Sequence, residues 1–446
     1  MKRAQAHVAR GTAHALQAHV FADCFDDIDG GLDLFDEIHE ALLNHYVDSG
    51  EEIVVLYSDT LKGVTVPPAA TIEIDRLDDS VAALPNSDAV FLIRAGDRSA
   101  YLAKTGMLRR RLLRILKPAA ESPRRSLNLR EVASSVEYWL TASRFESTLL
   151  HYALARREFP DGYLRLIKLR MPSYLKLILA NEYPRTQVTT RVAAGRGVYY
   201  GPFRTRGSAE LFENQFLDLF QLRRCQENLE PSPQHPGCIY GEMNMCLRPC
   251  QQAVSREEYL SEAGRVEEFL RGDGLALLNS TAAARDRLSQ EMNFEEAARQ
   301  HKRLERIEEV LASRDDLVAD IDRLYGIAIA PGLAPDSVLL WFNCQGWWQE
   351  PLLFPLTSNV SLDGRLKELA ASLQPVAAPV AQRQEHLALL ARWHYSTWSD
   401  GEWIGFHGLD QVPYRKLVRA ISRVRQKEAT GGSLTVSDAE PESSLQ

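Results

Sequence analysis

Residues 89–116, AVFLIRAGDRSAYLAKTGMLRRRLLRIL, combine two short apolar runs, a turn and a basic segment. The runs AVFLIR and SAYLA are rich in residues that favour strands, and the Gly and Asp of the intervening AGDR favour a tight turn. They therefore predict a β-hairpin. The next run, MLRRRLLRIL, repeats leucine at helical spacing and predicts an amphipathic basic helix.

The neighbouring sequence extends this hairpin into a domain. EVASSVEYWLTAS (131–143) predicts a strand, and FESTLLHYALARREF (145–159) predicts a helix that ends before Pro160. The order hairpin, helix, strand, helix indicates a small α+β domain. On the N-terminal side, EEIVVLYSD (51–59) and ATIEIDRL (70–77) predict strands, and residues 1 to about 45 predict helices.

The second half of the chain alternates between strand and helix patterns. Residues 163–171 and 185–192 predict strands, 195–203 a Gly- and aromatic-rich turn, and 208–225 a helix that leads into a cysteine-bearing loop. A capping box at Ser255–Glu258 starts a helix that should stop at Gly272. Residues 275–313 predict a helical hairpin with its turn near Met292-Asn293. Further strands are expected at 325–330, 337–343 and 347–356, a last helix at 382–404, and a polar, disordered tail.

Composition narrows the class of protein. Hydrophobic residues make up 45% of the 446 residues and charged residues 25%, which is ordinary for a globular protein. Without a run of about 18 apolar residues we expect no membrane span and no membrane partner. Without a secretory pattern, and with only six cysteines, we expect a cytoplasmic location.

Charge is unevenly distributed. The 52 basic and 60 acidic residues give a net charge of −8, which excludes a globally basic nucleic-acid binder but leaves room for a local basic patch. An acidic run occupies residues 23–40. The segment 100–118 carries only positive charges, which would attract a phosphate backbone: Lys104, Arg109, Arg110, Arg111, Arg114 and Lys117.

Four cysteines lie close together in the sequence, with gaps of 12, 7 and 3 residues: Cys225, Cys238, Cys246 and Cys250. Four thiols in one Pro/Gly-rich loop of a reducing compartment indicate metal binding, because thiolates are ligands for both zinc and iron–sulfur clusters. Structural zinc usually uses two short cysteine pairs, and only one short pair is present. Spacing alone leaves zinc, a cluster, unligated thiols and disulfides open.

In this order, the segments resemble the UvrC family of nucleotide-excision-repair nucleases. PNSDAVFLIRAGDRSAYLAKTGMLRRRL resembles the hairpin and basic helix of a GIY-YIG nuclease domain. GVYYGPF and the cysteine loop resemble the segment that follows it, and LSQEMNFEEAARQHKRLERIEEVL resembles the UVR motif, the hairpin by which UvrC and UvrB associate. The resemblance covers about residues 81 to 360.

The resemblance implies roles for individual residues. Tyr101, Lys104 and Arg111 match catalytic positions of the nuclease motif, and the basic segment would bind DNA through Lys104, Arg109, Arg110, Arg111 and Arg114. The first motif tyrosine is replaced by Phe91. The glutamate that holds the catalytic divalent ion is replaced by His151, although Mg²⁺ prefers oxygen ligands. His151 is thus either a ligand for Mn²⁺ or Zn²⁺ or a packed helix histidine.

Cofactors and partners follow from the same resemblance. It implies a 4Fe-4S cluster on the four cysteines, with zinc as the alternative, and Mg²⁺ or Mn²⁺ if the nuclease domain is active. It also implies that residues 280–313 bind a UvrB-like helical partner, with Phe294 and Ala298 in the contact. The acidic residues of the family's second nuclease domain are not found after the hairpin.

The resulting prediction is a multidomain α+β protein. Its parts are an acidic extension (1–80), a GIY-YIG-like α/β sandwich (81–170), a cysteine-cluster module (171–254), a helical region with the UVR motif (255–319), a mixed α/β region (320–430) and a tail (431–446).

Three functions are compatible with it. The first is a repair endonuclease that hydrolyses phosphodiesters (EC 3.1 class), and the second is a non-catalytic module that binds DNA and a UvrB-like partner. The third is a scaffold whose cluster serves redox or stability. Five tryptophans near the C-terminus could stack on bases, although core packing is the more frequent use: Trp347, Trp348, Trp393, Trp398 and Trp403.

Overall fold

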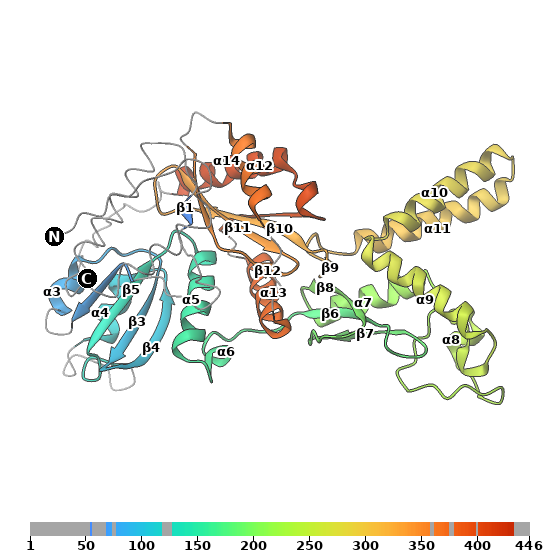
Figure 1. Ribbon diagram of the computed structural model, residues 1–446, viewed down its shortest axis with the longest axis horizontal. Helices are drawn as coiled ribbons and strands as arrows, with labels where there is room; N and C mark the ends of the chain where they lie inside the picture. The colour runs from blue at the N-terminus through green and yellow to red at the C-terminus, as the bar shows by residue number, and fades with distance from the viewer. Residues whose placement is uncertain are drawn as a thin grey trace, which may run out of the picture.

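The computed structural model describes residues 54–55, 68–73, 77–117, 127–356, 361–373, 379–397 and 400–431. The expected N-terminal helices lie outside these residues, as does the expected tail from residue 432 onward. The described part has three sheets with helices packed against them, which confirms an α+β architecture (Figure 1). None of the helices in the described part is long and apolar enough to cross a membrane.

The first sheet is antiparallel, with strand order β2-β5-β3-β4. Side chains alternate between its faces, so Phe91 packs toward α4 while Leu92 packs toward α5. The sheet is therefore covered by a helix on each side. Its elements are β2 (Ala70–Glu73), α3 (Leu77–Ala83), β3 (Ala89–Ala95), β4 (Arg98–Thr105), α4 (Leu108–Ile115), β5 (Ser135–Leu140), α5 (Arg144–Glu158) and the short α6 (Tyr163–Leu166).

The second sheet has the order β7-β6-β8-β9. The chain leaves this sheet after β8, forms every helix from α7 to α11, and returns as β9 to pair with β8. The helices α10 and α11 form an antiparallel hairpin that projects away from the body (Figure 1). The elements are β6 (Ser173–Ile178), β7 (Arg185–Thr189), β8 (Gly197–Phe203), α7 (Arg206–Leu217), α8 (Ile239–Glu242), η3 (Pro249–Gln251), α9 (Arg256–Arg271), α10 (Leu275–Gln290), α11 (Phe294–Ala312) and β9 (Ala319–Asp320).

The third sheet has the order β1-β13-β11-β10-β14, with β12 paired to β11. Apolar side chains of α12 and α14 pack on one face, and those of α13 pack on the other. On that second face α13 also meets α5 of the first sheet (Figure 1). The elements are β1 (Val54–Val55), β10 (Tyr325–Pro331), β11 (Ser337–Cys344), β12 (Trp347–Trp348), β13 (Leu352–Pro355), α12 (Leu362–Ser372), α13 (Val380–His394), β14 (Glu402–Phe406), η4 (Leu409–Gln411) and α14 (Tyr414–Gly431).

Several local predictions are confirmed by the structure. The hairpin formed by β3 and β4 and the following basic helix α4 form as expected. The side chain of Ser255 accepts from the backbone of Glu258 in a full capping box, and α9 ends at Gly272. The turn between α10 and α11 contains Met292 in the left-handed region, and Asn293 caps α11.

Three local predictions are wrong. Residues 163–171 form the short helix α6 and a turn, and the strand begins only at Ser173. Residues 197–203 are the strand β8 rather than a turn, because Val198 and Tyr200 pack on one core while Tyr199 packs on another. Residues 382–404 are not one helix, since α13 ends at His394 and β14 starts at Glu402.

Candidate functional site

Tyr101 and Arg111 lie on the face of the first sheet that α4 covers. The Arg111 guanidinium donates a hydrogen bond from Nη2 to the Tyr101 hydroxyl at 3.0 Å. Phe91 is fully buried beneath them, with its ring centroid 6.0 Å from that of Tyr101. Phe91 thus serves as a core residue where the nuclease motif would have a hydroxyl.

Lys104 lies on the opposite face of the same sheet. It is three residues beyond Tyr101 on β4, and strand side chains alternate. Its Nζ donates to Thr148 Oγ1 on α5. Burial, together with the nearby positive charges of Arg392 and Arg144, lowers the Lys104 pKa to about 8.

His151 is on α5, on the same side as Lys104. Burial, then the positive charges of Lys104 and Arg392, lower its pKa to about 4, so the imidazole is neutral at pH 7. Its buried Nε2 atom makes no hydrogen bond in the described structure. Two neighbouring cations repel a divalent metal ion, and this favours a packed helix histidine over a metal ligand.

The catalytic residues implied by the nuclease motif are therefore divided between two faces. The structure brings Tyr101 and Arg111 together, and it brings Lys104 and His151 together, but the sheet separates the two pairs. Among the described residues, no group of three or more His, Cys, Asp or Glu side chains is arranged to hold a metal ion.

The arginines of α4 form the exposed basic surface expected from the sequence. Arg109, Arg110 and Arg114 are exposed, whereas Arg111 is partly covered because it reaches Tyr101. Lys104 is half-buried against α5 and does not belong to this surface. The structure thus keeps the four arginines as candidate phosphate contacts and separates Lys104 from them.

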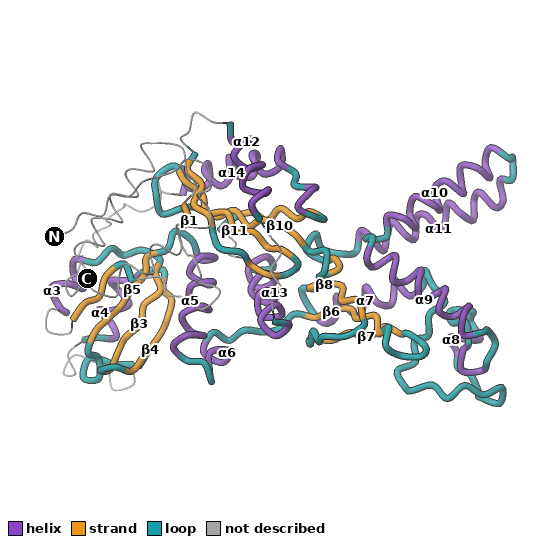
Figure 2. Tube along the Cα trace, in the orientation of Figure 1, coloured by secondary structure: helices purple, strands orange, loops and turns teal. Residues whose placement is uncertain are grey.

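The four clustered cysteines lie in the long loop segment between α7 and α9 (Figure 2). Cys246 and Cys250 are buried, Cys225 is half-buried, and Cys238 is exposed just before α8. The backbone amide of Arg248 donates to Cys246 Sγ at 3.4 Å, and Arg223 Nη1 lies 3.5 Å from Cys225 Sγ. Hydrogen bonds to sulfur are a feature of metal–thiolate sites.

The thiols influence one another electrostatically. Burial, with a smaller contribution from negative charge on the other three cysteines, raises the pKa of Cys246 to about 11. Burial likewise raises the pKa of Cys250, with contributions from Cys225 and Cys238. Cys246 and Cys250 are thus close enough to the other cysteines to be influenced by their charge, although the described side chains do not converge as a group of three or more metal ligands. Thiolates are nevertheless the donor type that zinc and iron–sulfur clusters use.

Arg223 and Tyr259 hold this loop in place. Arg223 is buried and donates to the carbonyl oxygens of Tyr183 at 3.0 Å and Glu227 at 2.9 Å. The Tyr259 hydroxyl accepts from the Arg223 amide and donates to the Pro184 carbonyl oxygen. Nothing in the sequence distinguishes Arg223 from its neighbour Arg224, so this role becomes visible only in the structure.

The end of the α10–α11 hairpin exposes apolar side chains. Met292 is 77% exposed and Phe294 is 66% exposed, and Ala298 is also on the surface. The C-terminal half of α11 instead packs into the core of the second sheet through Ile307 and Val310. The hairpin is therefore anchored at one end and presents an uncovered apolar end to solvent.

The C-terminal tryptophans mostly serve the core. Trp347, Trp348 and Trp393 are buried, and Trp403 packs against the same core while partly exposed. Trp398 lies outside the described residues. Core packing is confirmed for Trp347, Trp348 and Trp393.

Comparison with known proteins finds a family match over the second sheet and the segment that follows it. Residues 173–270 match the family model of the UvrC/Cho excinuclease middle domain. That range contains β6, β7 and β8, the cysteine loop and α9. The chain is thus similar to the UvrC/Cho excinucleases over this part.

The matching curated relatives are UvrABC system proteins C. That of Ruminiclostridium cellulolyticum is 25% identical over 251 residues, which is 55% of this chain and 40% of the relative. That of Methanothermobacter thermautotrophicus is 28% identical over 229 residues, covering 51% of this chain and 38% of the relative. The match spans about two fifths of the length of these relatives. No solved structure matches the chain. The resemblance to UvrC is confirmed.

Proposed function

We propose that the protein is a UvrC-like component of nucleotide excision repair that binds DNA and recruits a UvrB-like partner in the cytoplasm. One observation favours a binding role over a catalytic role. The first sheet separates Tyr101 and Arg111 from Lys104 and His151. In this proposal the first sheet and its helices are a GIY-YIG-like domain retained for binding.

DNA binding is assigned to α4. Arg109, Arg110 and Arg114 are exposed on one short helix, and Arg111 lies beside them. Guanidinium groups match phosphate oxygens in geometry and charge. No acidic residue lies within α4, so nothing in the helix itself offsets its attraction for a phosphate backbone.

Partner binding is assigned to residues 280–313, in which we recognise the UVR motif. The exposed side chains of Met292 and Phe294 support this assignment, because an apolar end on a projecting helical hairpin suits docking against another helix pair. The hairpin is held at its base by Ile307 and Val310, so its end is presented in a fixed orientation.

A 4Fe-4S cluster is assigned to Cys225, Cys238, Cys246 and Cys250, with zinc as the alternative. The proximity of the thiols and the N–H groups directed at two sulfur atoms support it. A bound cluster would tie the loop between α7 and α9 to a single conformation. Replacing Cys246 by Ser should lower the iron, or the zinc, counted per chain in anaerobically purified protein.

The second candidate function is an endonuclease of the EC 3.1 class that uses Mg²⁺ or Mn²⁺. The hydrogen bond between Arg111 and Tyr101 favours it, since both match catalytic positions of the nuclease motif. In that case Arg111 would stabilise charge on the phosphate.

A cleavage and binding assay separates the two functions. Anaerobically purified protein is incubated with damaged and undamaged duplex in Mg²⁺ and separately in Mn²⁺, beside an Arg111→Ala variant. We expect DNA binding without cleavage. Cleavage that disappears in the Arg111→Ala variant would overturn the non-catalytic assignment, and absence of binding by the wild type would overturn the role in DNA repair.

A further inference from the structure

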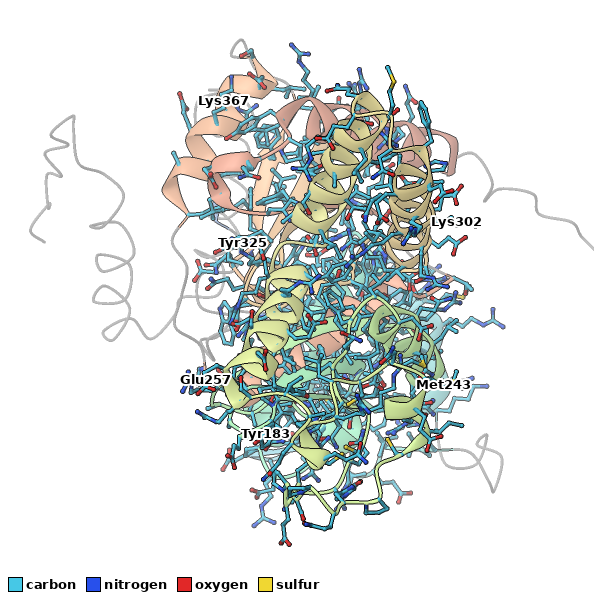
Figure 3. All side chains as sticks on the ribbon, turned by 90° about the vertical axis from the view of Figure 1, so that its right-hand side faces the viewer. Tyr183, Met243, Glu257, Lys302, Tyr325 and Lys367 are labelled. Carbon is cyan, nitrogen blue, oxygen red and sulfur yellow. The ribbon has the colours of Figure 1, made fainter. Side chains whose placement is uncertain are left out.

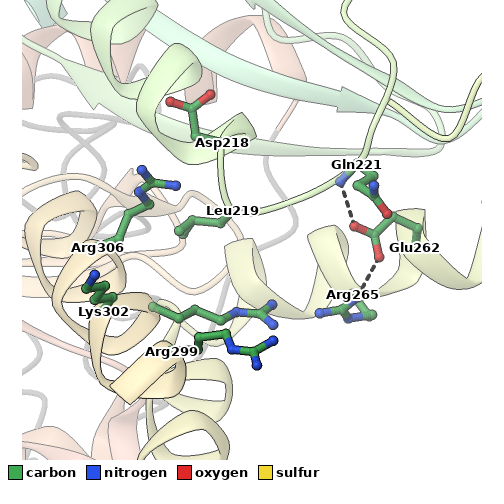
Figure 4. A pocket seen from close by; sticks show the side chains of 9 residues that line it. Asp218, Leu219, Gln221, Glu262, Arg265, Arg299, Lys302 and Arg306 are labelled. Atoms are coloured by element: carbon green, nitrogen blue, oxygen red, sulfur yellow. Dashed lines mark hydrogen bonds and ion pairs between the residues drawn. The ribbon is translucent and has the colours of Figure 1, made fainter. Parts of the chain in front are cut away.

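A cavity of about 560 Å³ lies between the start of the cysteine loop, α9 and α11. Figure 4 shows Lys302, Arg306 and Arg299 along the wall formed by α11, with Gln221 and Glu262 on the opposite side. Neither α4 nor the end of the hairpin contributes to it. Its lining is Asp218, Leu219, Gln221, Glu262, Arg265, Arg299, Lys302, Arg303 and Arg306.

Both carboxylates of this cavity are already engaged. Glu262 accepts from the Gln221 amide at 2.8 Å and from Arg265 at 2.7 Å (Figure 4). Asp218 pairs with Arg224, which lies outside the cavity, at 2.7 Å. They therefore do little to neutralise the cations of α11.

Three of those cations have no counter-charge within the described part of the chain. Lys302, Arg303 and Arg306 make no ion pair or side-chain hydrogen bond with any residue that the structure describes. Lys302 and Arg306 are exposed, and Lys302 lies on the flank of the molecule that also carries Met243, the residue after α8 (Figure 3). Arg299 pairs only with the neighbouring Glu296 at 3.2 Å.

The cations are spaced as one row. Positions 299, 302, 303 and 306 follow the i, i+3, i+4, i+7 pattern, so they share one face of α11. At 1.5 Å per residue the row is about 10 Å long. One strand of a DNA duplex carries a phosphate about every 3.4 Å along the axis, so the row matches roughly three phosphates.

We propose that this cavity binds the phosphodiester backbone of a nucleic acid. The proposal rests on the proposed function and deepens it by adding a second phosphate-binding surface, separate from α4. The row of guanidinium and ammonium groups suits phosphate oxygens, and Leu219 is the single apolar residue among those that line the cavity. The end of the hairpin, with Met292 and Phe294, remains accessible to a helical partner at the same time.

The test is the salt dependence of duplex DNA binding by the full chain. The variant Lys302→Gln/Arg306→Gln removes two unpaired cations of the row, and Arg285→Gln/Arg287→Gln on α10 is the matched control with the same change in charge. The slope of log K against log salt changes by about 0.9 for each lost phosphate contact. We expect the first variant to lower the slope by about 1.8, and the control to keep the wild-type slope.

Three outcomes overturn the proposal and are distinguishable. If the wild type binds DNA and the Lys302→Gln/Arg306→Gln variant keeps its slope, the cavity is not a phosphate site, although the proposed function stands. If that variant keeps its DNA slope but loses a UvrB-like helical partner, the cavity serves an acidic protein. If the wild type does not bind DNA, the proposed function fails with it. Thermal unfolding of each variant verifies the fold, and the single Lys302→Gln variant should show about half the change in slope.

Discussion

At the scale of single residues, His151 is a buried histidine whose charge state is set by its burial and its cationic neighbours. Its imidazole is enclosed by α5 and β4 and faces Lys104 and Arg392. Because both neighbours are cationic, protonating the ring adds a third positive charge in a poorly hydrated place. Neutral histidine is therefore the form that the folded protein tolerates.

This arrangement predicts a pH dependence of stability. The His151 pKa is about 4 when folded against 6.5 for the free side chain, so between these values the unfolded chain binds a proton that the folded chain does not. Stability must fall as pH falls through 6.5. Between pH 6.5 and 5.0 the wild type should lose about 1.5 kcal/mol more than a His151→Gln variant.

Urea unfolding at several pH values measures this difference. Comparing the variant with the wild type cancels the other groups that titrate in the same interval, including the fully buried His386, whose pKa is lowered to about 3. Parallel curves for the two proteins would contradict the assignment of a neutral, buried His151.

The sequence could have revealed part of the division of the site. Tyr101 and Lys104 are three residues apart on a strand, and that spacing alone places them on opposite faces. The contact between Arg111 and Tyr101 follows from the short connection between β4 and α4. The position of His151 beside Arg392 could not be anticipated, because it depends on how α5 packs against α13, more than 200 residues away in the chain.

At the scale of elements, the α10–α11 hairpin was predictable because its signals are local. Asn293 caps α11, and Met292 adopts the left-handed conformation that closes the turn. The strand β8 is mispredicted as a turn because it is stabilised by contacts with distant segments. Its glycines and aromatic residues are typical of a turn, yet Gly197 fits against the backbone of β6, where a Cβ atom would come within 2.9 Å of the Leu177 carbonyl oxygen.

The exposed end of the hairpin leads to a prediction on partner binding. Phe294 is 66% exposed and touches none of the buried cores, so Phe294→Asp should leave the unfolding temperature unchanged. The introduced charge would be dehydrated at a helix–helix contact, and binding of a UvrB-like helical partner should fall at least about tenfold. Ala298→Asp should act in the same direction.

Titration calorimetry with the partner measures the effect. Ser289→Asp, an exposed position on α10 near the same turn, controls for the added charge. Undiminished binding by the Phe294→Asp protein would remove the reason for assigning the partner to this end of the hairpin.

At the scale of the whole molecule, one core joins the first and third sheets. Phe145 of α5 is fully buried, with its ring centroid 4.4 Å from Trp393 and 5.2 Å from Trp348. Glu385 of α13 accepts hydrogen bonds from Tyr152 at 2.6 Å and Tyr163 at 2.7 Å. The two sheets are thus packed together by aromatic contacts and a buried carboxylate.

Removing the central ring should weaken this joint. Phe145→Ala should cost about 3–5 kcal/mol in the free energy of unfolding, because it opens a cavity among rigid tryptophans. Phe354→Ala is the matched control, since Phe354 is equally buried but belongs to the core under α12 and α14. Hydrogen exchange should rise in both α5 and α13 only for Phe145→Ala. A loss below about 1 kcal/mol would show that the two sheets do not depend on this contact.

The pairing of β8 with β9 has a mechanical consequence. The cysteine loop and the projecting hairpin form a single excursion that leaves the second sheet at Phe203 and returns at Ala319 to lie against β8. Only four residues then separate Asp320 from Tyr325, where β10 of the third sheet begins. A load placed on the hairpin is therefore transmitted both to the core of the second sheet, through Ile307 and Val310, and through β9 into β10.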